Sequence, residues 1–594
     1  MQIQLLRAIA VIWVISFHLG IEVMRFGYLG VDIFFVISGF LMRSLYSEIG
    51  TRQSNIRFWL KRLQRLVPSF TVVSLIFLLL FWMRSLPFER SSIAREYLFS
   101  GAFVSNFLFW TQDQYFSSNS LRPFLHTWSL SIEVQFYALF PAILILQRHK
   151  LRIAIGVMFS SFLSYIFIQL YSPNTSFFLL PFRIWEFMLG IFAANFFARK
   201  LKKPTKRLNE IVLLTLLFLM PIVFSYVDSQ TSNPFALFLT LMMTVLVLIK
   251  CSFEWKSNSI VIRVLGFVGD RSYVYYLVHF PLIVLLNYVP LRGNNLFFGN
   301  LLTLLIYLSI LVCLSEFIYK YVDSKRTVRL LSRRQLFVLL LVPLTIFSSS
   351  NYFMLSVFKS KNEKLVSASQ LDRTPFRCGT IPRIQTLQDL RIVSPYCKLY
   401  DGHGKNRYLL IGNSHADSIK TSIAQVVKQV GGDFYLVAEN MNLNSSNLKN
   451  LLRVVKQLEP SIIIFHSSHN SYDFNVLRQF LHNTSKEVKD YFFIESIPTY
   501  AFNIPERVLQ DVDLPSTYNL DFFQKRNSEE NKLVNQLAEQ YPIHFVSTVH
   551  TFCQATCKVV NPSGNLLYFD SNHLTLTGAR LLEPVLFQNF IEIS

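Results

Sequence analysis

Long apolar runs follow one another through the first three fifths of this chain. Their lengths are close to the roughly 20 residues that an α-helix needs to cross a bilayer core. Polar or basic connections separate the runs, as expected for a polytopic helical membrane domain. We predict eleven membrane-spanning helices, at about residues 3–19, 27–42, 69–83, 128–146, 153–171, 178–197, 210–227, 235–249, 272–289, 298–319 and 336–356.

Two segments of this part need separate interpretation. The first twenty residues contain an early arginine and an apolar stretch, as a signal peptide does, but no small-residue cleavage site follows them. We therefore interpret them as the first transmembrane helix. The stretch 97–110 is shorter than a full span, so we expect an interfacial or re-entrant segment there.

After Phe358 the hydrophobic pattern changes to that of a soluble domain. The short apolar runs 407–412 and 461–466 are typical of buried strands, and the segments 418–431 and 445–458 have helical spacing. Strands that alternate with helices predict an α/β domain with a parallel sheet.

The distribution of charge indicates how the chain lies in a membrane. Residues 1–357 contain 33 Lys and Arg against 14 Asp and Glu, whereas the remainder contains 24 against 22. With the N-terminus in the cytoplasm, the predicted cytoplasmic connections hold 24 basic residues and the opposite ones hold five. Cytoplasmic loops collect Lys and Arg, so we expect this orientation, with the polar domain outside the cytoplasm. No nucleic-acid partner is expected, because the polar domain is nearly neutral.

The cysteines lead to the same side of the membrane. Cys251 and Cys313 lie in or beside apolar runs and are expected to be isolated thiols. The polar domain contains the other four, which are Cys378, Cys397, Cys553 and Cys557. Four cysteines there suggest two disulfides and an oxidising compartment. The spacing favours a bond between Cys553 and Cys557, which leaves the other two as a pair. A zinc site is the alternative, although the spacings are not of the paired C-x2-C type.

Several ionisable residues lie inside apolar segments, where they are costly and therefore functional candidates. They are Arg7, His18, Asp32, Glu133, Arg183, Glu186 and His279. Arg183 and Glu186 are three residues apart on one helical face and could instead form a structural ion pair. Asp32 could simply cap the second helix. For His18 we favour chemistry, because histidine is the side chain best suited to proton transfer at neutral pH.

A basic segment, IRFWLKRLQRLVP, follows the second predicted helix. Its cations are Arg57, Lys61, Arg62 and Arg65. They could bind lipid phosphates at the membrane surface, or they could form an anion site for a phosphate-bearing substrate. The residues alone leave both interpretations open.

Six motifs occur one after another in the first 325 residues, and their order is informative. They are Arg7 and His18 with ten residues between them, GVDIFFVISGF, the R-x-x-R-x-x-P segment of Arg62, Arg65 and Pro68, TWSLSIEVQFY, RIWEFMLG and SYVYYLVHFPL. Together they resemble the membrane-bound acyltransferase-3 family, which O-acylates bacterial cell-surface sugars. The resemblance implies an acyl donor of the acetyl-CoA type on the cytoplasmic side. It further implies that Arg62 and Arg65 contact the CoA phosphates and that Arg7 and His18 serve acyl transfer.

The polar domain carries candidate residues of a hydrolase-like site. In LLIGNSHADS, at 409–418, Ser414 follows a predicted strand, and Asp570 and His573 are three apart in YFDSNHLTL. That spacing can bring a carboxylate to one imidazole nitrogen and leave the other for the serine, as in a Ser-His-Asp arrangement. Taken singly, Asp570 could be a helix cap and His573 a surface residue.

These residues resemble the SGNH hydrolase family, in the form fused behind acyltransferase-3 domains. The resemblance covers about 370–594 and implies oxyanion donors from the serine N–H, a glycine and an asparagine. Asn470 is the candidate asparagine, and the glycine is not identified. The family more often has an aspartate where this chain has Asn413, whose side chain we expect to order the loop.

We therefore predict three segments: an acyltransferase membrane domain at 1–325, a further helix and linker at 326–369, and a periplasmic domain at 370–594. The predicted enzyme of the bacterial inner membrane transfers an acyl group, expected to be acetyl, from acyl-CoA to a lipid-linked or surface glycan. Lipopolysaccharide O-antigen or core is the acceptor we expect. We expect no bound cofactor and no metal. The alternatives are a membrane-anchored carbohydrate esterase and a non-enzymatic transporter. The sequence leaves the sugar, the acyl length and the oligomeric state open.

Overall fold

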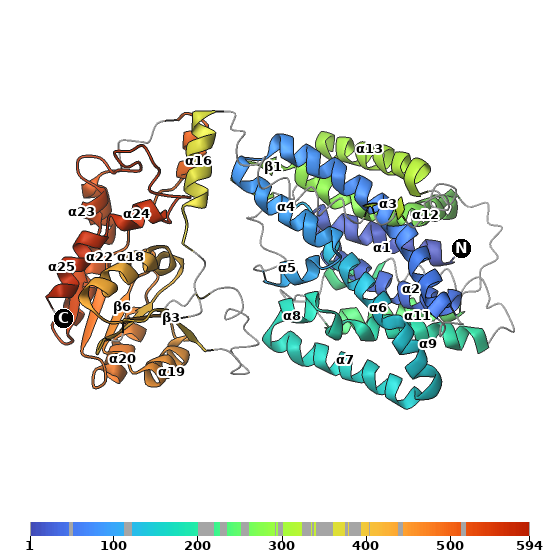
Figure 1. Cartoon of the computed structure of the whole chain (residues 1–594), viewed down its shortest axis with the longest axis horizontal. Helices are drawn as coiled ribbons and strands as arrows, with labels where there is room; N and C mark the ends of the chain where they lie inside the picture. Colours follow the sequence, from blue (N-terminus) through green and yellow to red (C-terminus); the bar gives the residue numbers. More distant parts are fainter. Residues whose placement is uncertain are drawn as a thin grey trace. The chain divides into compact units, whose positions relative to one another are not determined.

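The structure of the protein is a computed structural model. It describes residues 2–46, 52–111, 121–199, 219–225, 234–250, 260–291, 293–294, 301–323, 334–335, 338–339, 360–374, 378, 394–402, 404–437, 443–512 and 518–592. The chain forms two compact units (Figure 1), one of Met1–Ser85 with Glu89–Met354 and one of Leu86–Phe88 with Leu355–Ser594. The first unit is helical, and the second is built around a sheet.

Apolar helices make up the N-terminal part. They are α1 (Gln2–His18), α2 (Gly30–Leu45), α3 (Arg52–Arg84), α4 (Pro87–Gly101), α5 (Ser105–Thr111), α6 (Thr127–His149), α7 (Leu151–Tyr171), α8 (Pro173–Phe178), α9 (Ile184–Arg199), α11 (Pro234–Lys250), α12 (Ile260–Leu286) and α13 (Leu301–Ile318). The short strands β1 (Tyr288–Val289) and β2 (Gly293–Asn294) form a hairpin after α12.

Five stretches of the described residues are long and apolar enough to cross a membrane: Glu22–Leu45, Asn55–Arg84, Thr127–Leu146, Leu151–Tyr171 and Leu301–Asp323. Three shorter apolar helices are Ile3–His18, Ile184–Asn195 and Phe235–Leu248. The helical, apolar character of this part is therefore confirmed. The number of eleven spans stays a prediction, because most of 210–227 and nearly all of 336–356 lie outside the described residues.

One local expectation needs correction. The basic segment does not form a separate connection, because it continues without a break into the following apolar run as the single helix α3, with Pro68 inside it. Its amphipathic pattern has the same helical period as the apolar run, so one helix accommodates both. The stretch 97–110 is divided between the end of α4 and α5, and its interfacial or re-entrant character stays a prediction.

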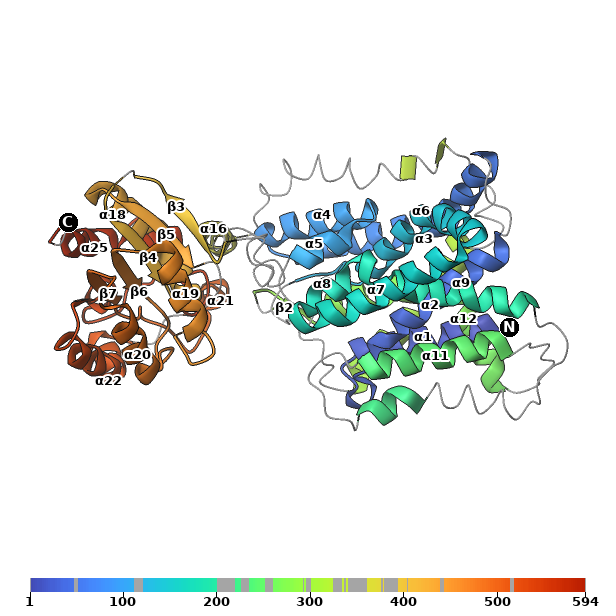
Figure 2. The same ribbon diagram turned by 90° about the horizontal axis from the view of Figure 1, so that it is seen from below.

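Glycines bring the central helices into very close contact. A Cβ at Gly39 of α2 would lie 1.9 Å from the Phe187 carbonyl oxygen of α9, and one at Gly190 would lie 2.0 Å from the Val36 oxygen. Small residues allow membrane helices to pack backbone against backbone. α1 packs along α12 in the same way (Figure 2), where Gly269 approaches Gln4. These four helices carry the buried residues His18, Asp32, Glu186 and His279.

The C-terminal unit contains a six-stranded sheet in the order β3-β5-β4-β6-β7-β8. The strands are β3 (Tyr396–Tyr400), β4 (Arg407–Ile411), β5 (Asp433–Val437), β6 (Ile462–Phe465), β7 (Asp490–Ile494) and β8 (Ile543–Val546). Five strands are parallel, as predicted, but β3 pairs antiparallel with β5. The sheet is therefore mixed rather than wholly parallel.

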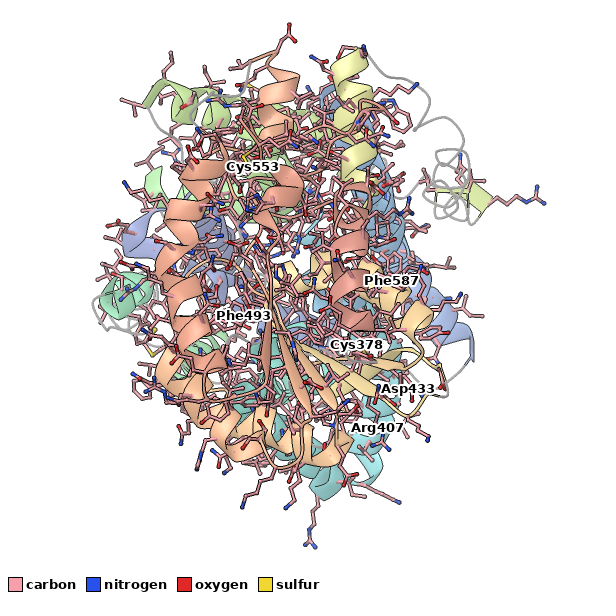
Figure 3. The ribbon with its side chains drawn as sticks, turned by 90° about the vertical axis from the view of Figure 1, so that its left-hand side faces the viewer. Cys378, Arg407, Asp433, Phe493, Cys553 and Phe587 are labelled. Carbon is pink, nitrogen blue, oxygen red and sulfur yellow. A yellow bond between two sulfur atoms is a disulfide. The ribbon has the colours of Figure 1, made fainter. Side chains whose placement is uncertain are left out.

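Helices cover both faces of this sheet. The helices of the unit are α16 (Lys361–Leu371), α18 (Ser414–Val430), α19 (Leu448–Leu458), α20 (Phe474–Thr484), α21 (Ile504–Leu509), α22 (Leu520–Ala538), α23 (Val549–Phe552), α24 (Leu576–Arg580) and α25 (Glu583–Ile591). α19, α20 and α22 share one apolar core with the sheet. α18 and α25 pack together on strands of the sheet. In Figure 3, Arg407 and Asp433 mark the starts of β4 and β5, and Cys553 lies towards the opposite end.

The topology itself indicates where a site should form. The chain leaves β4 for β5 on one side and returns to β6 on the other side of β4. In open α/β sheets, ligands bind beyond the carboxyl ends of the strands at such a switch point. The structure also forms the two disulfides that the spacing favoured, Cys378–Cys397 and Cys553–Cys557. Cys313 is a free thiol, and Cys251 lies outside the described residues.

Candidate active sites

Ser414 stands where β4 ends and α18 begins, at the switch point. Asn413 caps the helix, because its Oδ1 accepts the His415 N–H at 3.0 Å. Gly412 is required just before it, since a Cβ there would lie 1.8 Å from the His466 carbonyl oxygen after β6. The N-terminus of α18 therefore presents the serine hydroxyl at the edge of the sheet, beside the segment that follows β6.

Ser414, His573 and Asp570 form one hydrogen-bonded chain. The Ser414 Oγ lies 2.7 Å from His573 Nε2, and His573 Nδ1 lies 2.7 Å from Asp570 Oδ2. The other carboxylate oxygen of Asp570 accepts the N–H groups of Asn572 at 2.8 Å and His573 at 2.7 Å. The local turn thus fixes the carboxylate, the carboxylate orients the imidazole, and the imidazole meets the serine. This is the arrangement that activates a serine nucleophile.

The electrostatics keep the Asp570 carboxylate ionised. Burial alone would raise its pKa, but the hydrogen bond and charge of His573 and the two backbone N–H groups outweigh burial and lower the pKa below its usual value. The side chains of His573 and Asp570 are 20% and 30% exposed, so the site is open to a substrate. An ionised carboxylate stabilises the imidazolium that forms when His573 takes the serine proton.

Asn413 ties the two loops of the site together. Its Nδ2 donates to the hydroxyls of Ser468 at 2.9 Å and Ser471 at 3.3 Å, and its Oδ1 also accepts the Ser468 N–H at 3.3 Å. The neutral amide supplies donors that an aspartate could not. The side chain therefore orders the loop, as expected.

The oxyanion candidate Asn470 is not brought to the serine by any described contact. It is exposed and has a left-handed backbone with φ of 57°. The Ser414 N–H is a better-placed donor, because it is the first N–H of α18 and the positive end of a helix favours a developing anion.

In the helical unit, three predicted cations line one pocket. Arg7, Arg62 and Arg65 surround it together with Glu133. Further lining comes from α2, α6 and α12, through Ser38, Ser129, Tyr137, Tyr273 and Tyr276 among others. Arg57 and Lys61 are exposed on the outer side of α3. The basic segment thus divides into an outer half and a half that faces the pocket.

Arg62 is the most unusual of these cations. It is 5% exposed, and its guanidinium lies 5.5 Å from the Tyr46 ring and 5.3 Å from the Tyr137 ring. Its Nε and Nη2 have no hydrogen-bond partner among the described residues. A buried cation with unmet donors is costly unless an anion completes it.

Asp32, Arg183 and Glu186 form a separate, fully buried cluster. Arg183 Nη1 lies 2.6 Å from Asp32 Oδ1 and 2.8 Å from Glu186 Oε1. Leu29, not Asp32, occupies the cap position of α2 and makes no side-chain cap bond. The expected pair of Arg183 and Glu186 is present, and Asp32 completes it as an ion-paired residue that joins α2 to α9.

His18 does not face the arginine pocket. Its Nδ1 lies 3.1 Å from Nε2 of His279, whose Nδ1 lies 2.6 Å from the Tyr276 carbonyl oxygen. His18 lies eleven positions after Arg7 in α1, which is about 16 Å along a helix axis. The two residues expected to act together therefore belong to different levels of the unit.

Comparison with known proteins decides the family. The profile of an acyltransferase domain, acyltransferase-3, matches residues 2–320, which is more than half of the chain. The chain belongs to the acyltransferase-3 family. An SGNH domain of the kind fused to acyltransferase-3 domains matches residues 377–588. The resemblance drawn from the motifs, the acyltransferase class of the enzyme and its character as a multi-pass membrane protein are confirmed.

The acyltransferase-3 architecture extends to named relatives. A Staphylococcus aureus (strain COL) protein with a provisional O-acetyltransferase name is 27% identical over 489 residues, covering 75% of this chain and 79% of that protein. O-acetyltransferase OatA of Staphylococcus aureus (strain NCTC 8325 / PS 47) is 32% identical over 346 residues, covering 54% and 56%. A solved periplasmic domain of a Salmonella serovar Paratyphi A lipopolysaccharide acetyltransferase matches at 14% identity and a TM-score of 0.25, over 32% of this chain and 82% of that one.

A segment that no sequence motif predicted supports the serine site of this acyltransferase-3 protein. The Asp372 carbonyl oxygen accepts the Leu576 N–H at 2.8 Å, and Thr374 donates to the Asp417 carbonyl oxygen at 3.1 Å. The Arg373 guanidinium lies 4.0 Å from the Phe569 ring, which stacks on His573. Three consecutive residues after α16 thus touch both halves of the site.

Two buried histidines behind the serine were also missed. His415 is 1% exposed, its ring centre lies 4.8 Å from that of His573, and neither of its nitrogens has a hydrogen-bond partner among the described residues. Burial lowers its pKa well below 6.5, and the charges of His573 and His466 lower it further. Burial also lowers the pKa of His466 to about 4. Both rings are therefore neutral at physiological pH.

Proposed function

We propose that this acyltransferase-3 protein is an O-acetyltransferase of the bacterial inner membrane. It takes an acetyl group from acyl-CoA on the cytoplasmic side and places it on a hydroxyl of a cell-surface glycan on the periplasmic side. The observation that carries this proposal is the hydrogen-bonded chain of Ser414, His573 and Asp570. The names of the two Staphylococcus aureus relatives support acetyl as the acyl group.

The pocket of arginines supports a CoA-type donor. Arg62, Arg65 and Arg7 gather positive charge at one level of the helical unit, and the unmet donors of Arg62 suit phosphate oxygens. His18 lies about 16 Å further along α1. A donor with anionic groups at one end and a thioester at the end of a long, thin arm suits this separation. His18 would then act as the base at the thioester end.

The serine site can complete the transfer in two steps. Ser414 Oγ attacks the acyl carbonyl that the membrane domain delivers, and His573 Nε2 takes the hydroxyl proton. The group that held the acyl in the membrane domain leaves with that proton. The acyl group is then bound to Ser414 as an ester. A glycan hydroxyl then gives its proton to His573 and attacks the ester, which returns Ser414 and releases the acetylated glycan. The Ser414 N–H stabilises the oxyanion in both steps.

The orientation rests on charge and on cysteine chemistry. The excess of Lys and Arg in the predicted cytoplasmic connections supports a cytoplasmic N-terminus, and the two disulfides suit an oxidising periplasm. Lipopolysaccharide O-antigen or core is the first acceptor to test, and peptidoglycan or capsule would use the same chemistry.

Inverted membrane vesicles with purified glycan enclosed in the lumen, where the C-terminal domain would lie, and radiolabelled acetyl-CoA supplied outside test the proposal. We expect label in the glycan from the wild type and at least about a hundredfold less from Ser414→Ala, since the nucleophile is lost. Ser485→Ala, an exposed serine that ends α20, is the matched control and should behave as wild type. Release of label only as free acetate would indicate an esterase, and absence of any covalent change would indicate a transporter. Full glycan labelling by Ser414→Ala would remove the role assigned to the C-terminal domain.

A further inference from the structure

Neither transfer step at the serine uses Arg373, a cation at the edge of that site. Arg373 is exposed and lies just before the SGNH match, which begins at residue 377. Its guanidinium lies 4.0 Å from the centre of the Phe569 ring. The same ring is stacked on the His573 imidazole, with 5.5 Å between the ring centres and 6° between the planes. The cation and the catalytic imidazole therefore share one aromatic neighbour.

The backbone is held on both sides of Arg373. The preceding residue, Asp372, accepts the Thr577 N–H through Oδ2 at 3.0 Å, and the following residue, Thr374, donates to the Asp417 carbonyl oxygen at 3.1 Å. The first bond leads to the segment that carries the catalytic histidine, and the second leads to the helix that begins with the nucleophile. Because the arginine is fixed relative to both halves of the site, less entropy is lost when its side chain binds a ligand.

The N–H groups of the Arg373 guanidinium have no partner within the part of the chain that the structure describes. The side chain makes neither a hydrogen bond nor an ion pair there. Packing against the domain lowers the pKa of Arg373, and the charge of Asp570 raises it, so the two groups are close enough to interact. Both Asp570 oxygens nevertheless accept hydrogen bonds already, from two backbone N–H groups and from His573. The donors of the arginine are therefore left for another anion.

We propose that Arg373 is a specificity residue of the serine site, which binds a carboxylate or a phosphate of the acceptor glycan. This inference rests on the proposed function, because it names the chemical class of the acceptor. A guanidinium matches the oxygens of either anion with two parallel N–H···O bonds. An acidic sugar held in this way has its neighbouring hydroxyls beside His573, which takes the hydroxyl proton in the second transfer step. The acceptor is thus a negatively charged glycan, acetylated on or next to its charged sugar.

Matched glycans test this inference with the full-length protein in detergent, where acetyl-CoA and glycan both have access. The purified glycan is supplied in native form, after reduction of its carboxylates to alcohols, and after removal of its phosphates. We expect one of the two treatments to raise the wild-type KM for glycan about tenfold, which identifies the anion. Arg373→Gln should raise the KM for native glycan by about the same factor, with kcat within about threefold, and should not distinguish native from treated glycan.

Two further variants complete the comparison. Arg373→Lys keeps the charge but loses the fork, so its KM for native glycan should lie between those of the wild type and Arg373→Gln. Arg478→Gln, an exposed arginine of α20, is the matched control and should keep the wild-type KM. Equal wild-type KM values for all three glycans would overturn the inference, as would an Arg373→Gln variant that still prefers the native glycan.

The rival role for Arg373 is support of the catalytic triad through Asp570. Hydrolysis of p-nitrophenyl acetate by the full-length protein reports on the triad without acetyl-CoA or glycan, and Ser414→Ala gives the background. We expect Arg373→Gln to lose at least about fivefold less on this ester than on native glycan at concentrations below KM. Equal losses on the two reactions would assign Arg373 to the triad and refute its role in acceptor binding.

Binding separates this inference from the proposed function. Calorimetric titration of the full-length protein with native and treated glycans needs no acyl transfer. We expect the wild type to bind the native glycan with a Kd about tenfold lower than that for the treated one, and Arg373→Gln to bind both equally. If label never reaches the glycan, the proposed function fails, and these Kd values alone decide the role of Arg373. If label reaches the glycan but neither Kd nor KM depends on Arg373, the proposed function stands and the inference fails.

Discussion

At the scale of single residues, the protein orients two histidines with different partners. His573, 20% exposed on its side chain, is held by an ionised aspartate at 2.7 Å. His18, buried among helices, has the ring of His279 as a side-chain partner at 3.1 Å. Water and backbone N–H groups can stabilise a carboxylate at the first place but not at the second. The dielectric surroundings therefore explain the difference in partner.

Arg62 allows a sharp test of the donor site. Its planar guanidinium lies near two tyrosine rings, and its Nε and Nη2 are available to donate hydrogen bonds to an anion. Lysine has the charge but neither the plane nor the fork. We expect Arg62→Lys to raise the KM for acetyl-CoA by about tenfold or more with a smaller effect on kcat. Arg57→Lys, on the exposed side of the same helix, is the control. Equal KM values for the two variants would argue against a phosphate contact at Arg62.

The buried histidine His466 predicts a pH-dependent stability of the C-terminal domain. Burial lowers its pKa to about 4, whereas the unfolded chain has a pKa near 6.5. Between these pH values His466 is protonated in the unfolded state but not in the folded state. The free energy of unfolding therefore falls as the pH is lowered from 6.5 to 4, by up to about 3 kcal/mol. Hydrogen exchange of β6 and β7 at several pH values measures this. His466→Asn should show a smaller dependence, and an unchanged dependence would assign it to other groups.

How much of the sites could be predicted depends on how local their contacts are. Asp570 and His573 are three residues apart, so their pairing was visible in the sequence. His126 directly precedes the motif TWSLSIEVQFY, yet its place beside His279 depends on the packing of distant helices. The same holds for Asp372 and Arg373, whose contacts lie about two hundred residues away in the chain.

At the scale of elements, the contact between α2 and α9 depends on the absence of side chains. The neighbour of Gly39 is a backbone carbonyl, which cannot rotate away. We expect Gly39→Ala to destabilise the fold by about 1–3 kcal/mol or more and to lower the apparent Tm in size-exclusion assays of heated, detergent-solubilised protein. Gly156→Ala on α7 is the control, because nothing lies within 4 Å of its Cβ position. Equal losses of Tm for the two variants would contradict this account.

The elements that the sequence missed are those set by tertiary contacts. The apolar runs 407–412 and 461–466 predicted β4 and β6, whereas β5, β7 and β8 were not predicted individually. β3, with the sequence YCKLY, is short and partly exposed. Its antiparallel direction follows from pairing with β5 and from the bond of Cys397 to Cys378. Similarly, no local signal distinguishes a basic connection from the first turns of α3.

At the scale of the whole molecule, the orientation can be tested by thiol labelling of intact cells. A membrane-impermeant maleimide should label the C-terminal domain only after an impermeant reductant opens its disulfides, because both bonds are expected on the periplasmic side. A cysteine introduced at Lys206, in the predicted cytoplasmic connection 198–209, should react only after lysis. Labelling of the Lys206 cysteine in intact cells would reverse the proposed orientation.

The residues after α16 have a practical consequence for anyone who divides the protein. The SGNH match begins at residue 377, but Asp372 and Thr374 hold the segments that carry His573 and Ser414. A soluble fragment that begins where the sequence similarity begins would therefore lose hydrogen bonds that hold its catalytic residues in place. The useful cut lies ahead of Ser360, whose hydroxyl caps α16. The limit of the functional domain lies where its hydrogen bonds end, upstream of where its similarity begins.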